Sequence, residues 1–536
     1  MLWSERQTAY IPLSSPAMLF TTDPPIAEKI QKMQGRVRWQ QTAVLERNID
    51  QTQLWIDDGQ AETESFSFMV LGDSGTGCYR GDRPQRRVAE ALLAHGEDAR
   101  FTLHTGDVVY LVGSSEQYFE NFIEPYREHL VGGHAPRQIA YDQMVFQRPV
   151  FSTLGNHDYY DLPIISGIAS VATRPLRRLL QTYVDVDLGW HGSYTGDAFA
   201  RAFIDYLRGV NEAQLAAHLD QHYIAKSPVG KRCLRYVPGE FTRLPNRYYS
   251  FRYGGIDFFA LDSNTFNTPR PIADNAEGQQ RRQQLENSLQ QLRARQKQCL
   301  DEIAHYQHAE TADESLTDLS AEAEQVAEQI RDIEKQLDAV SQPNTVDLDQ
   351  LNWLRDRIIA SWQDPQARGR IVFFHHPPYV TEATKWPQGQ TLAVRRNLRS
   401  VLTAVEGQIG RQTPPLVDLV INGHAHCMEH LQTGDNGLAD ARVNYIVCGG
   451  SGYSLRRQRT NGPMIQEAVG TEIQPVAHSQ RYIGRAGHGS EKQRPYSCLR
   501  VEVKAGNPPQ FVAIPVIAEK KHYEWKTYAD KPFELR

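Results

Sequence analysis

The sequence has no run of apolar residues that approaches the ~20 residues needed to cross a bilayer as a helix. Its first 20 residues show no basic start followed by a long apolar stretch, so no signal peptide is evident. The six cysteines form no CxxC pair and no dense framework, which favours free thiols in a reducing compartment. From these absences we expect a cytoplasmic protein without membrane association.

An excess of positive charge is also missing. The formal net charge is -6. Affinity for nucleic acid comes mainly from neutralising phosphates, so the chain has no bulk attraction to nucleic acid. At 536 residues it can bury a large core, either as one domain with insertions or as two domains.

The glycine-rich stretch VLGDSGTGCY at residues 70–79 lacks the residues of a nucleotide-binding loop. Gly72 and Gly77 have the G-x-x-x-x-G spacing of a P-loop, but Cys78 and the residue after it stand where a P-loop needs Lys and Ser/Thr. The dinucleotide pattern G-x-G-x-x-G is not met either. What remains is one carboxylate, Asp73, at the end of a predicted strand.

Short β-rich runs alternate with amphipathic segments from about residue 66 onward, which predicts a layered α/β architecture. Two strand-like runs around Tyr253-Gly254-Gly255 predict a β-hairpin. Residues 160–245 are interpreted as an insertion that carries loops over a site. The β runs resume after residue 343, so the regular pattern flanks the segment before it on both sides.

That flanked segment, residues 276–342, is rich in Gln, Glu, Arg, Leu and Ala, with apolar residues at alternating spacings of four and three. Two heptad helices joined by a polar turn predict an antiparallel coiled-coil hairpin. The hairpin is either a self-contained arm or a device for dimerisation or for docking a protein partner. We expect it to be dispensable for chemistry, because its heptads can pair internally and the candidate site residues lie outside it.

Polar side chains follow five predicted strands, each at the carboxyl end. The motifs are GDSG at 72–75, GDVVY at 106–110, GNHD at 155–158, VFFHH at 372–376 and GHAH at 423–426. In open α/β sheets ligands gather at these ends. Each motif alone is typical of a turn or of a satisfied buried side chain. Together they bring two Asp, one Tyr, one Asn and three or four His, which exceeds the needs of one metal ion and indicates two ions that share a carboxylate.

In this form and order the motifs resemble those of the calcineurin-like metallophosphoesterases, and most closely the purple acid phosphatase pattern GDxG, GDxxY, GNH(D/E), VxxH, GHxH. The resemblance covers most of residues 66–452 and implies a metallophosphoesterase-type β-sandwich flanked by helices, with the hairpin inserted. It implies one metal held by Asp73, Tyr110 and His426, a second held by Asn156, His375 and His424, and Asp107 as the bridge.

The chain departs from the wider superfamily in its first motif. Many members have a DxH pair there, whereas Gly75 stands two residues after Asp73 and Tyr110 is expected to replace the missing ligand. Purple acid phosphatases are commonly secreted, and no export signal is evident here. A reducing cytosol would favour divalent ions over the ferric–divalent centre typical of that family. The cofactors expected are therefore two divalent or mixed-valence ions of Fe, Mn or Zn.

The resemblance implies hydrolysis of a phosphoester substrate by a metal-bound hydroxide, without a covalent enzyme intermediate. His157 is expected to contact phosphate and protonate the leaving oxygen, with Asp158 orienting it. His376 is either a second substrate contact or a structural imidazole. A phosphodiesterase rather than a monoesterase is one alternative function. Another is a non-catalytic scaffold that binds a partner, but such a scaffold is expected to lose metal ligands, and none is lost.

The predicted organisation has four parts. They are an N-terminal extension (1–64), the first half of the metallophosphoesterase domain (65–275), the hairpin (276–342), and the second half with C-terminal strands (343–536).

Overall fold

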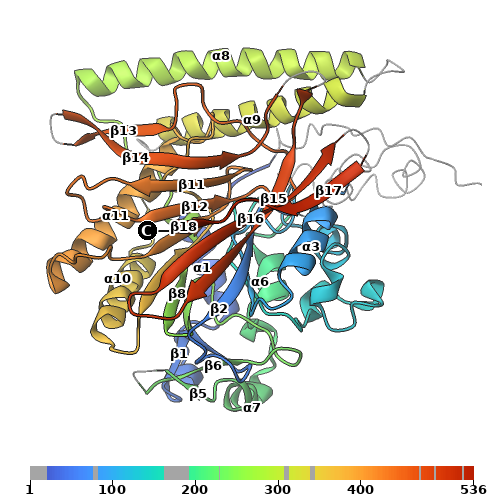
Figure 1. The fold of residues 1–536 in the computed structure, drawn as a ribbon, viewed down its shortest axis with the longest axis vertical. Coiled ribbons are helices and arrows are strands. Elements are labelled where there is room, and N and C mark those ends of the chain that lie inside the picture. Colours follow the sequence, from blue (N-terminus) through green and yellow to red (C-terminus); the bar gives the residue numbers. More distant parts are fainter. Residues whose placement is uncertain are drawn as a thin grey trace, which may run out of the picture.

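The computed structural model describes residues 21–75, 83–161, 192–227, 230–306, 313–338, 345–469, 472–487, 491–521 and 524–535. Two β-sheets form the centre of the molecule, and helices pack around them (Figure 1). Residues 162–191 of the predicted insertion lie outside the described residues, as do Gly77 and Cys78.

The larger sheet has eleven strands and is mixed. In spatial order they are β13 (Met464–Val469), β14 (Glu472–Ile483), β11 (Met428–Thr433), β12 (Asn444–Cys448), β10 (Leu419–Asn422), β9 (Gly369–Phe373), β8 (Ile256–Ala260), β7 (Tyr249–Tyr253), β1 (Ile49–Ile56), β6 (Arg232–Tyr236) and β5 (Ala225–Lys226). Strands β8, β9, β10 and β12 are parallel neighbours. Their carboxyl ends therefore meet at one edge.

The smaller sheet has seven strands. They are β17 (Glu524–Ala529), β16 (Gln510–Lys521), β15 (Pro495–Lys504), β2 (Phe66–Leu71), β3 (Thr102–His104) and β4 (Val150–Ser152) in spatial order, with β18 (Phe533–Leu535) paired to β16. Strands β2, β3 and β4 run parallel, so a second set of carboxyl ends lies together.

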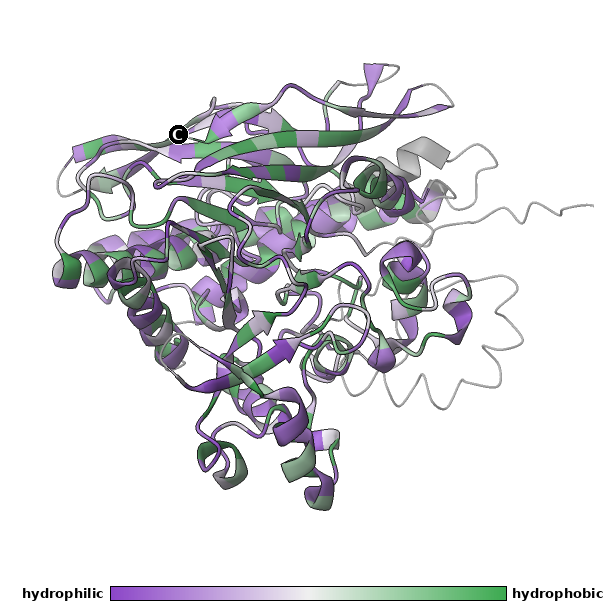
Figure 2. Ribbon diagram, turned by 60° about the horizontal axis from the view of Figure 1, so that its bottom comes forward, coloured by the Kyte–Doolittle hydropathy of each residue, from purple (hydrophilic) through white to green (hydrophobic). Residues whose placement is uncertain are grey.

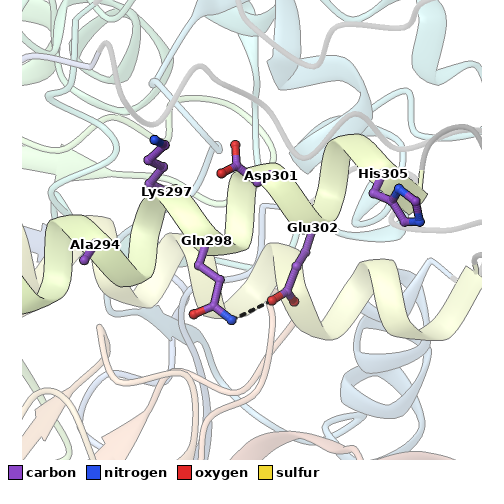
Figure 3. Close-up of a pocket in the computed structure, with 6 residues that line it drawn as sticks. All are labelled: Ala294, Lys297, Gln298, Asp301, Glu302 and His305. Atoms are coloured by element: carbon purple, nitrogen blue, oxygen red, sulfur yellow. Dashed lines mark hydrogen bonds between the residues drawn. The ribbon is translucent and has the colours of Figure 1, made fainter.

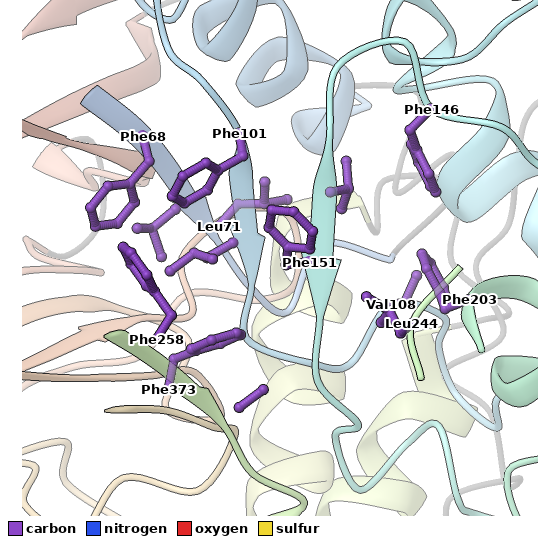
Figure 4. Packing of buried hydrophobic residues seen from close by; sticks show 14 of the residues in the cluster. Phe68, Leu71, Phe101, Val108, Phe146, Phe151, Phe203, Leu244, Phe258 and Phe373 are labelled. Atoms are coloured by element: carbon purple, nitrogen blue, oxygen red, sulfur yellow. The ribbon is translucent and has the colours of Figure 1, made fainter. Parts of the chain in front are cut away.

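The two sheets pack through phenylalanine side chains (Figure 4). Phe68 of β2 lies 5.5 Å from Phe258 of β8, and Phe151 of β4 lies 4.5 Å from Phe251 of β7, measured between ring centroids. Phe101, just before β3, contacts both Phe251 and Phe258. Each fully buried Phe contributes roughly 1.5–3 kcal/mol of transfer free energy, so this layer fixes how the sheets face each other.

Nine α-helices lie within the described residues. They are α1 (Ile26–Arg36), α2 (Thr42–Leu45), α3 (Pro84–His95), α6 (Asp197–Phe203), α7 (Glu212–His222), α8 (Ala276–Tyr306), α9 (Asp313–Asp338), α10 (Leu348–Gln363) and α11 (Gly389–Ile409). Leu354 and Ile358 of α10 and Leu398 of α11 share a buried cluster with Val372 and Val420 of the larger sheet. Figure 2 shows largely hydrophobic central strands and helices of mixed character. The predicted layered α/β class is confirmed.

The predicted hairpin around Tyr253-Gly254-Gly255 is also confirmed, because β7 and β8 pair antiparallel across a two-residue turn. Gly254 and Gly255 have φ of 54° and 75°. Such a turn needs positive φ at both central residues, and glycine adopts it without a steric penalty.

The N-terminal range, predicted to be an extension outside the metallophosphoesterase domain, contains regular structure within residues 21–64. It holds α1, α2 and β1, and β1 lies inside the larger sheet between β7 and β6. Most residues of β1 are buried, Leu54 and Ile56 among them. This part of the chain therefore contributes to the domain core.

Helices α8 and α9 occupy the range predicted for the hairpin and lie side by side (Figure 1). Arg281 of α8 donates to Gln336 of α9, and Arg295 pairs with Glu322. Early residues of one helix thus contact late residues of the other, as in an antiparallel pair. Coiled-coil packing between them stays a prediction. In the described residues no helix is both long and apolar enough to cross a membrane.

Candidate metal centre

The predicted ligands follow the carboxyl ends of parallel strands in both sheets. Asp73 comes after β2, Asp107 after β3 and Asn156 after β4, all in the smaller sheet. His375 comes after β9 and His424 after β10 in the larger sheet. The site therefore lies where the two sets of carboxyl ends meet, and packing of the two sheets brings both halves of the chain to it.

The backbone beneath these side chains is strained. Four predicted ligands have left-handed φ: Asp73 at 54°, Asp107 at 53°, His424 at 69° and His426 at 47°. Non-glycine residues rarely adopt this conformation, which costs about 1 kcal/mol or more and clusters at functional sites. Four such residues at neighbouring positions indicate that the fold imposes the direction of the side chains.

Glycines next to the ligands allow close approach. A Cβ atom at Gly155 would lie 2.1 Å from Oδ1 of Asp107, and one at Gly423 would lie 2.5 Å from Oδ2 of Asp73. Both distances are far below van der Waals contact. The glycines of the GNHD and GHAH motifs are thus required by the space that the two carboxylates occupy.

The first group of donors gathers around the hydroxyl of Tyr110. This oxygen lies 2.8 Å from Oδ2 of Asp107, 3.1 Å from Oδ1 of Asp73 and 3.2 Å from Nε2 of His426. All four side chains are buried. They are the three residues predicted for one metal together with the predicted bridge.

The second group gathers around Nε2 of His375. This nitrogen lies 3.0 Å from Oδ1 of Asn156, 3.2 Å from Nδ1 of His424 and 3.3 Å from Oδ2 of Asp107. Ligands bound at ~2.1 Å to one ion stand about 3.0–3.4 Å apart. Both groups therefore have spacings that suit an ion, and the oxygen Oδ2 of Asp107 belongs to both.

The electrostatics of the cluster also suit cations. In the described residues, the ion-pair partners of Asp107 and Asp73 are His375 and His426. Burial and then the charge of Asp107 raise the pKa of Asp73, with His375 opposing them. Burial lowers the pKa of His375, but Asp107 outweighs it and raises that pKa to about 9. Buried carboxylates are normally paired or bound to metals, and this donor set fits Fe, Mn or Zn.

His157 lies beside the cluster. The prediction that Asp158 orients its ring is wrong. Its Nδ1 lies 2.6 Å from the carbonyl oxygen of Leu111, and this carbonyl orients the ring. Burial lowers the pKa of His157, and the charge of Asp107 opposes that shift. The carboxylate of Asp158 instead accepts hydrogen bonds from the backbone N–H groups of Asp107, Val108 and Gly155, at 3.0, 3.1 and 2.9 Å. Asp158 therefore fixes the loop that carries the predicted bridge.

His376 also lies at the cluster. A nitrogen of its ring stands within 4.8 Å of nitrogens of His375 and His424, and the three form a second candidate metal group beside Asp73, Asp107 and His375. The Nδ1 of His376 lies 2.8 Å from Oγ of Ser263. The position agrees with either a substrate contact or a structural imidazole.

The residues that pack against His424 were not predicted from the sequence. Nζ of Lys385 lies 3.1 Å from Nε2 of His424 and 2.7 Å from Oε2 of Glu328, a residue of α9. Of the two alternatives for the hairpin, the self-contained arm is therefore wrong. The charged residues of α9 recur at helical spacing, a pattern that a solvated face shows equally, so the sequence held no signal for this contact.

A separate groove of about 600 Å³ runs along α8. Its described lining consists of Ala294, Lys297, Gln298, Asp301, Glu302 and His305 (Figure 3). None of the predicted site residues lies there. Docking of a protein partner on the hairpin stays a prediction.

No protein-family model matches the chain, and no curated protein sequence matches it. The chain is similar to a solved structure described as GAP50, the anchor in the inner membrane complex of Plasmodium, with 12% identity, a TM-score of 0.36, and coverage of 88% of this chain and 89% of that one. It is also similar to the structure of PhoD, with 12% identity, a TM-score of 0.36, and coverage of 89% and 70%. Similarity at this level supports no inference about activity.

Proposed function

We propose that the chain is a metal-dependent phosphoester hydrolase with a dinuclear centre. The observation that carries the proposal is the position of Asp107, whose Oδ2 lies 2.8 Å from the Tyr110 hydroxyl and 3.3 Å from Nε2 of His375. One carboxylate thus reaches both donor groups. Asp73, Tyr110 and His426 would hold one ion, and Asn156, His375 and His424 would hold the other.

Two ions so placed would clamp a phosphoryl group, stabilise its attacking and leaving oxygens, and lower the pKa of a water molecule. Side chains of the protein supply the proton for the leaving oxygen and a further contact for the phosphate. The carbonyl of Leu111 occupies Nδ1 of His157 and leaves Nε2 to face a substrate oxygen. In its protonated form His157 donates a proton to the leaving oxygen. His376, held by Ser263, is a second contact for the phosphate.

The metals proposed are Fe, Mn or Zn. The phenol oxygen of Tyr110 is a hard donor that suits Fe(III), whereas the histidine nitrogens suit Mn(II) or Zn(II) as well. The proposal covers phosphomonoesters and phosphodiesters. A hydrolysis screen of both classes, run on protein whose metal content has been measured, separates the two.

The bridging role of Asp107 can be tested by the substitution Asp107→Asn. Removing the shared negative charge should reduce bound metal from about two equivalents to below one and should abolish most hydrolysis. Elemental analysis and a phosphoester assay give the two measurements. Asp98→Asn is the matched control, because Asp98 is exposed, pairs with Arg500 and lies outside the predicted ligand set.

Full metal occupancy and turnover in Asp107→Asn would contradict the assignment. A wild-type protein that binds two metals but hydrolyses neither monoesters nor diesters would favour the non-catalytic scaffold.

A further inference from the structure

The stretch GGSGY at residues 449–453 lies at the candidate metal centre, although it belongs to none of the five predicted motifs. It follows β12, which runs parallel to β10 in the larger sheet. Ser451 donates its backbone N–H to the carbonyl of Gly72 at 3.3 Å, and its hydroxyl oxygen accepts the N–H of Gly72 at 3.2 Å. The backbone N–H of Tyr453 donates to the carbonyl of Asp73 at 3.1 Å. These bonds fix the stretch to the strand end that carries Asp73.

Two glycines bring this stretch against the Asp73 segment. A Cβ atom at Gly449 would lie 2.6 Å from Oδ2 of Asp73, and one at Gly452 would lie 2.4 Å from the carbonyl oxygen of Ser74. Any other side chain at these positions would collide with that segment. The glycines therefore let the stretch pass close enough for Tyr453 to reach the site.

The side chain of Tyr453 packs against two of the three residues predicted for one ion. Its ring lies parallel to that of Tyr110, with centroids 4.1 Å apart and an interplanar angle of 8°. It meets the ring of His426 edge to face, with centroids 5.1 Å apart and an angle of 77°. Stacked and edge-to-face pairs are the arrangements that aromatic rings prefer. Together with its backbone bond to Asp73, Tyr453 thus contacts every residue predicted for that ion except the bridge, Asp107.

These contacts confine the ring of Tyr110. Besides Tyr453, the ring packs against His157, with centroids 4.2 Å apart. Tyr110, Leu111 and Tyr453 form a small buried cluster of their own, apart from the two large clusters of the core. Core packing therefore does not set the plane of this ring, and the neighbouring rings do. Because the phenol oxygen lies on the long axis of the ring, a tilt of the ring would move that oxygen away from Asp107.

We infer that Tyr453 is a positioning residue for the ion in the Tyr110 donor group: its ring holds the rings of Tyr110 and His426 so that the phenol oxygen and Nε2 converge. These two atoms are 3.2 Å apart. The inference rests on the proposed dinuclear function. Tyr453 acts through its ring and not through its hydroxyl. Ligands whose orientation is fixed by packing bind a metal more tightly, because less freedom is lost on binding.

The test follows Fe³⁺ binding to the full-length metal-free protein, with Fe³⁺ supplied as its nitrilotriacetate complex. The phenolate-to-iron band reports the Tyr110 donor group, because Tyr110 is the one tyrosine among the predicted ligands. Tyr453→Phe keeps the ring and removes the hydroxyl. Tyr453→Met and Tyr453→Leu remove the ring and fill its space with apolar atoms. Tyr248→Met is the matched control, because Tyr248 is 4% exposed against 5% for Tyr453, packs against Trp353 and lies outside the predicted ligand set.

Wild type, Tyr453→Phe and Tyr248→Met should show the same band and the same half-saturating concentration of Fe³⁺. In Tyr453→Met and Tyr453→Leu the band should be displaced, and half-saturation should need a ~10–100-fold higher concentration, as is typical when a residue that orients a ligand is lost. At the concentration that saturates wild type, bound iron should fall from about two equivalents toward about one, since the second donor group gathers around His375 and not around Tyr110.

Three results would overturn the inference. One is a Tyr453→Met or Tyr453→Leu protein that has the wild-type melting temperature, measured without metal, and keeps the wild-type band and half-saturation. The second is a Tyr453→Phe protein without the wild-type band, which would assign the effect to the hydroxyl. The third is a wild-type protein that binds two ions without any band, which would leave the dinuclear centre standing without Tyr110 as a ligand. A wild-type protein that binds fewer than two ions would remove the proposed dinuclear centre, and the inference with it.

Discussion

Among single residues, the convergence of the candidate ligand side chains could be predicted from the sequence, and their hydrogen-bond partners could not. The motifs around Asp107 and His375 follow strand ends, and strand ends of parallel sheets meet at one edge, so their convergence follows from the pattern. The contact between His157 and the carbonyl of Leu111 depends on the path of a loop. So does the contact of Asp158 with three backbone N–H groups. No residue pattern encodes that path.

Tyr110 offers a spectroscopic test for iron at the candidate metal centre. Its hydroxyl lies within 3.2 Å of Asp73, Asp107 and His426, so a metal in that group would contact the phenol oxygen. Iron-loaded, oxidised protein should show a visible phenolate-to-iron absorption band that is lost in Tyr110→Phe. An iron-loaded, oxidised sample without such a band would rule out ligation by Tyr110. Tyr118→Phe, a buried tyrosine outside the predicted ligand set, is the control.

His157 is expected to act as a general acid. Such a group contributes ~10²–10⁴-fold, and it matters most for a poor leaving group. His157→Ala should therefore slow hydrolysis of an alkyl phosphate far more than that of p-nitrophenyl phosphate, with metal content near that of wild type. The rates on the two substrates and elemental analysis give the measurements.

Equal losses on both substrates with metal retained would assign His157 to phosphate binding instead. Loss of metal would place it among the ligands. The sign of the pKa shift also matters. Burial lowers the pKa of His157, so in the free protein the ring stays neutral down to a lower pH than a free imidazole does. The acid role requires the protonated form and is therefore favoured as the pH falls.

At the scale of elements, the hairpin is where prediction from sequence was least complete. The heptads of residues 276–342 predicted two long helices, and α8 and α9 occupy that range. The same pattern gave no reason to expect that Glu328 and Asp332 would be buried against the domain. Charged residues at helical spacing are solvated in most proteins, and only the tertiary packing distinguishes the two cases.

The contacts of α9 reverse the expectation that the hairpin is dispensable. Replacing residues 276–342 with a Gly/Ser linker leaves Lys385 without Glu328 and the start of α11 without Asp332. Hydrolysis should fall by at least about tenfold, because the buried charge of Lys385 loses its partner and the segment beside His424 is displaced. The matched control replaces only residues 304–318 and keeps the contacting part of α9, so it should retain wild-type activity. Full activity in the larger deletion would show that α9 does not support the site.

For the molecule as a whole, the layered class and the β7–β8 hairpin follow from the periodicity of the strands. The position of β1 does not. Ile49–Ile56 lies in a polar N-terminal range, yet it pairs between β7 and β6 in the larger sheet. Its pairing partners are about 180 residues or more away in sequence, as in Gln53 with Ser250 and Ile49 with Arg232. Local composition carries no information about such pairing.

The central claim is that two metal ions share Asp107 where the two sheets meet. The most direct measurement is anomalous X-ray diffraction from crystals of the metal-loaded protein, recorded at the absorption edges of Fe, Mn and Zn. The account predicts two peaks roughly 3.5–4 Å apart, one at the Tyr110 donor group and one at the His375 donor group, with Asp107 between them. A single peak, or peaks away from both groups, would contradict it.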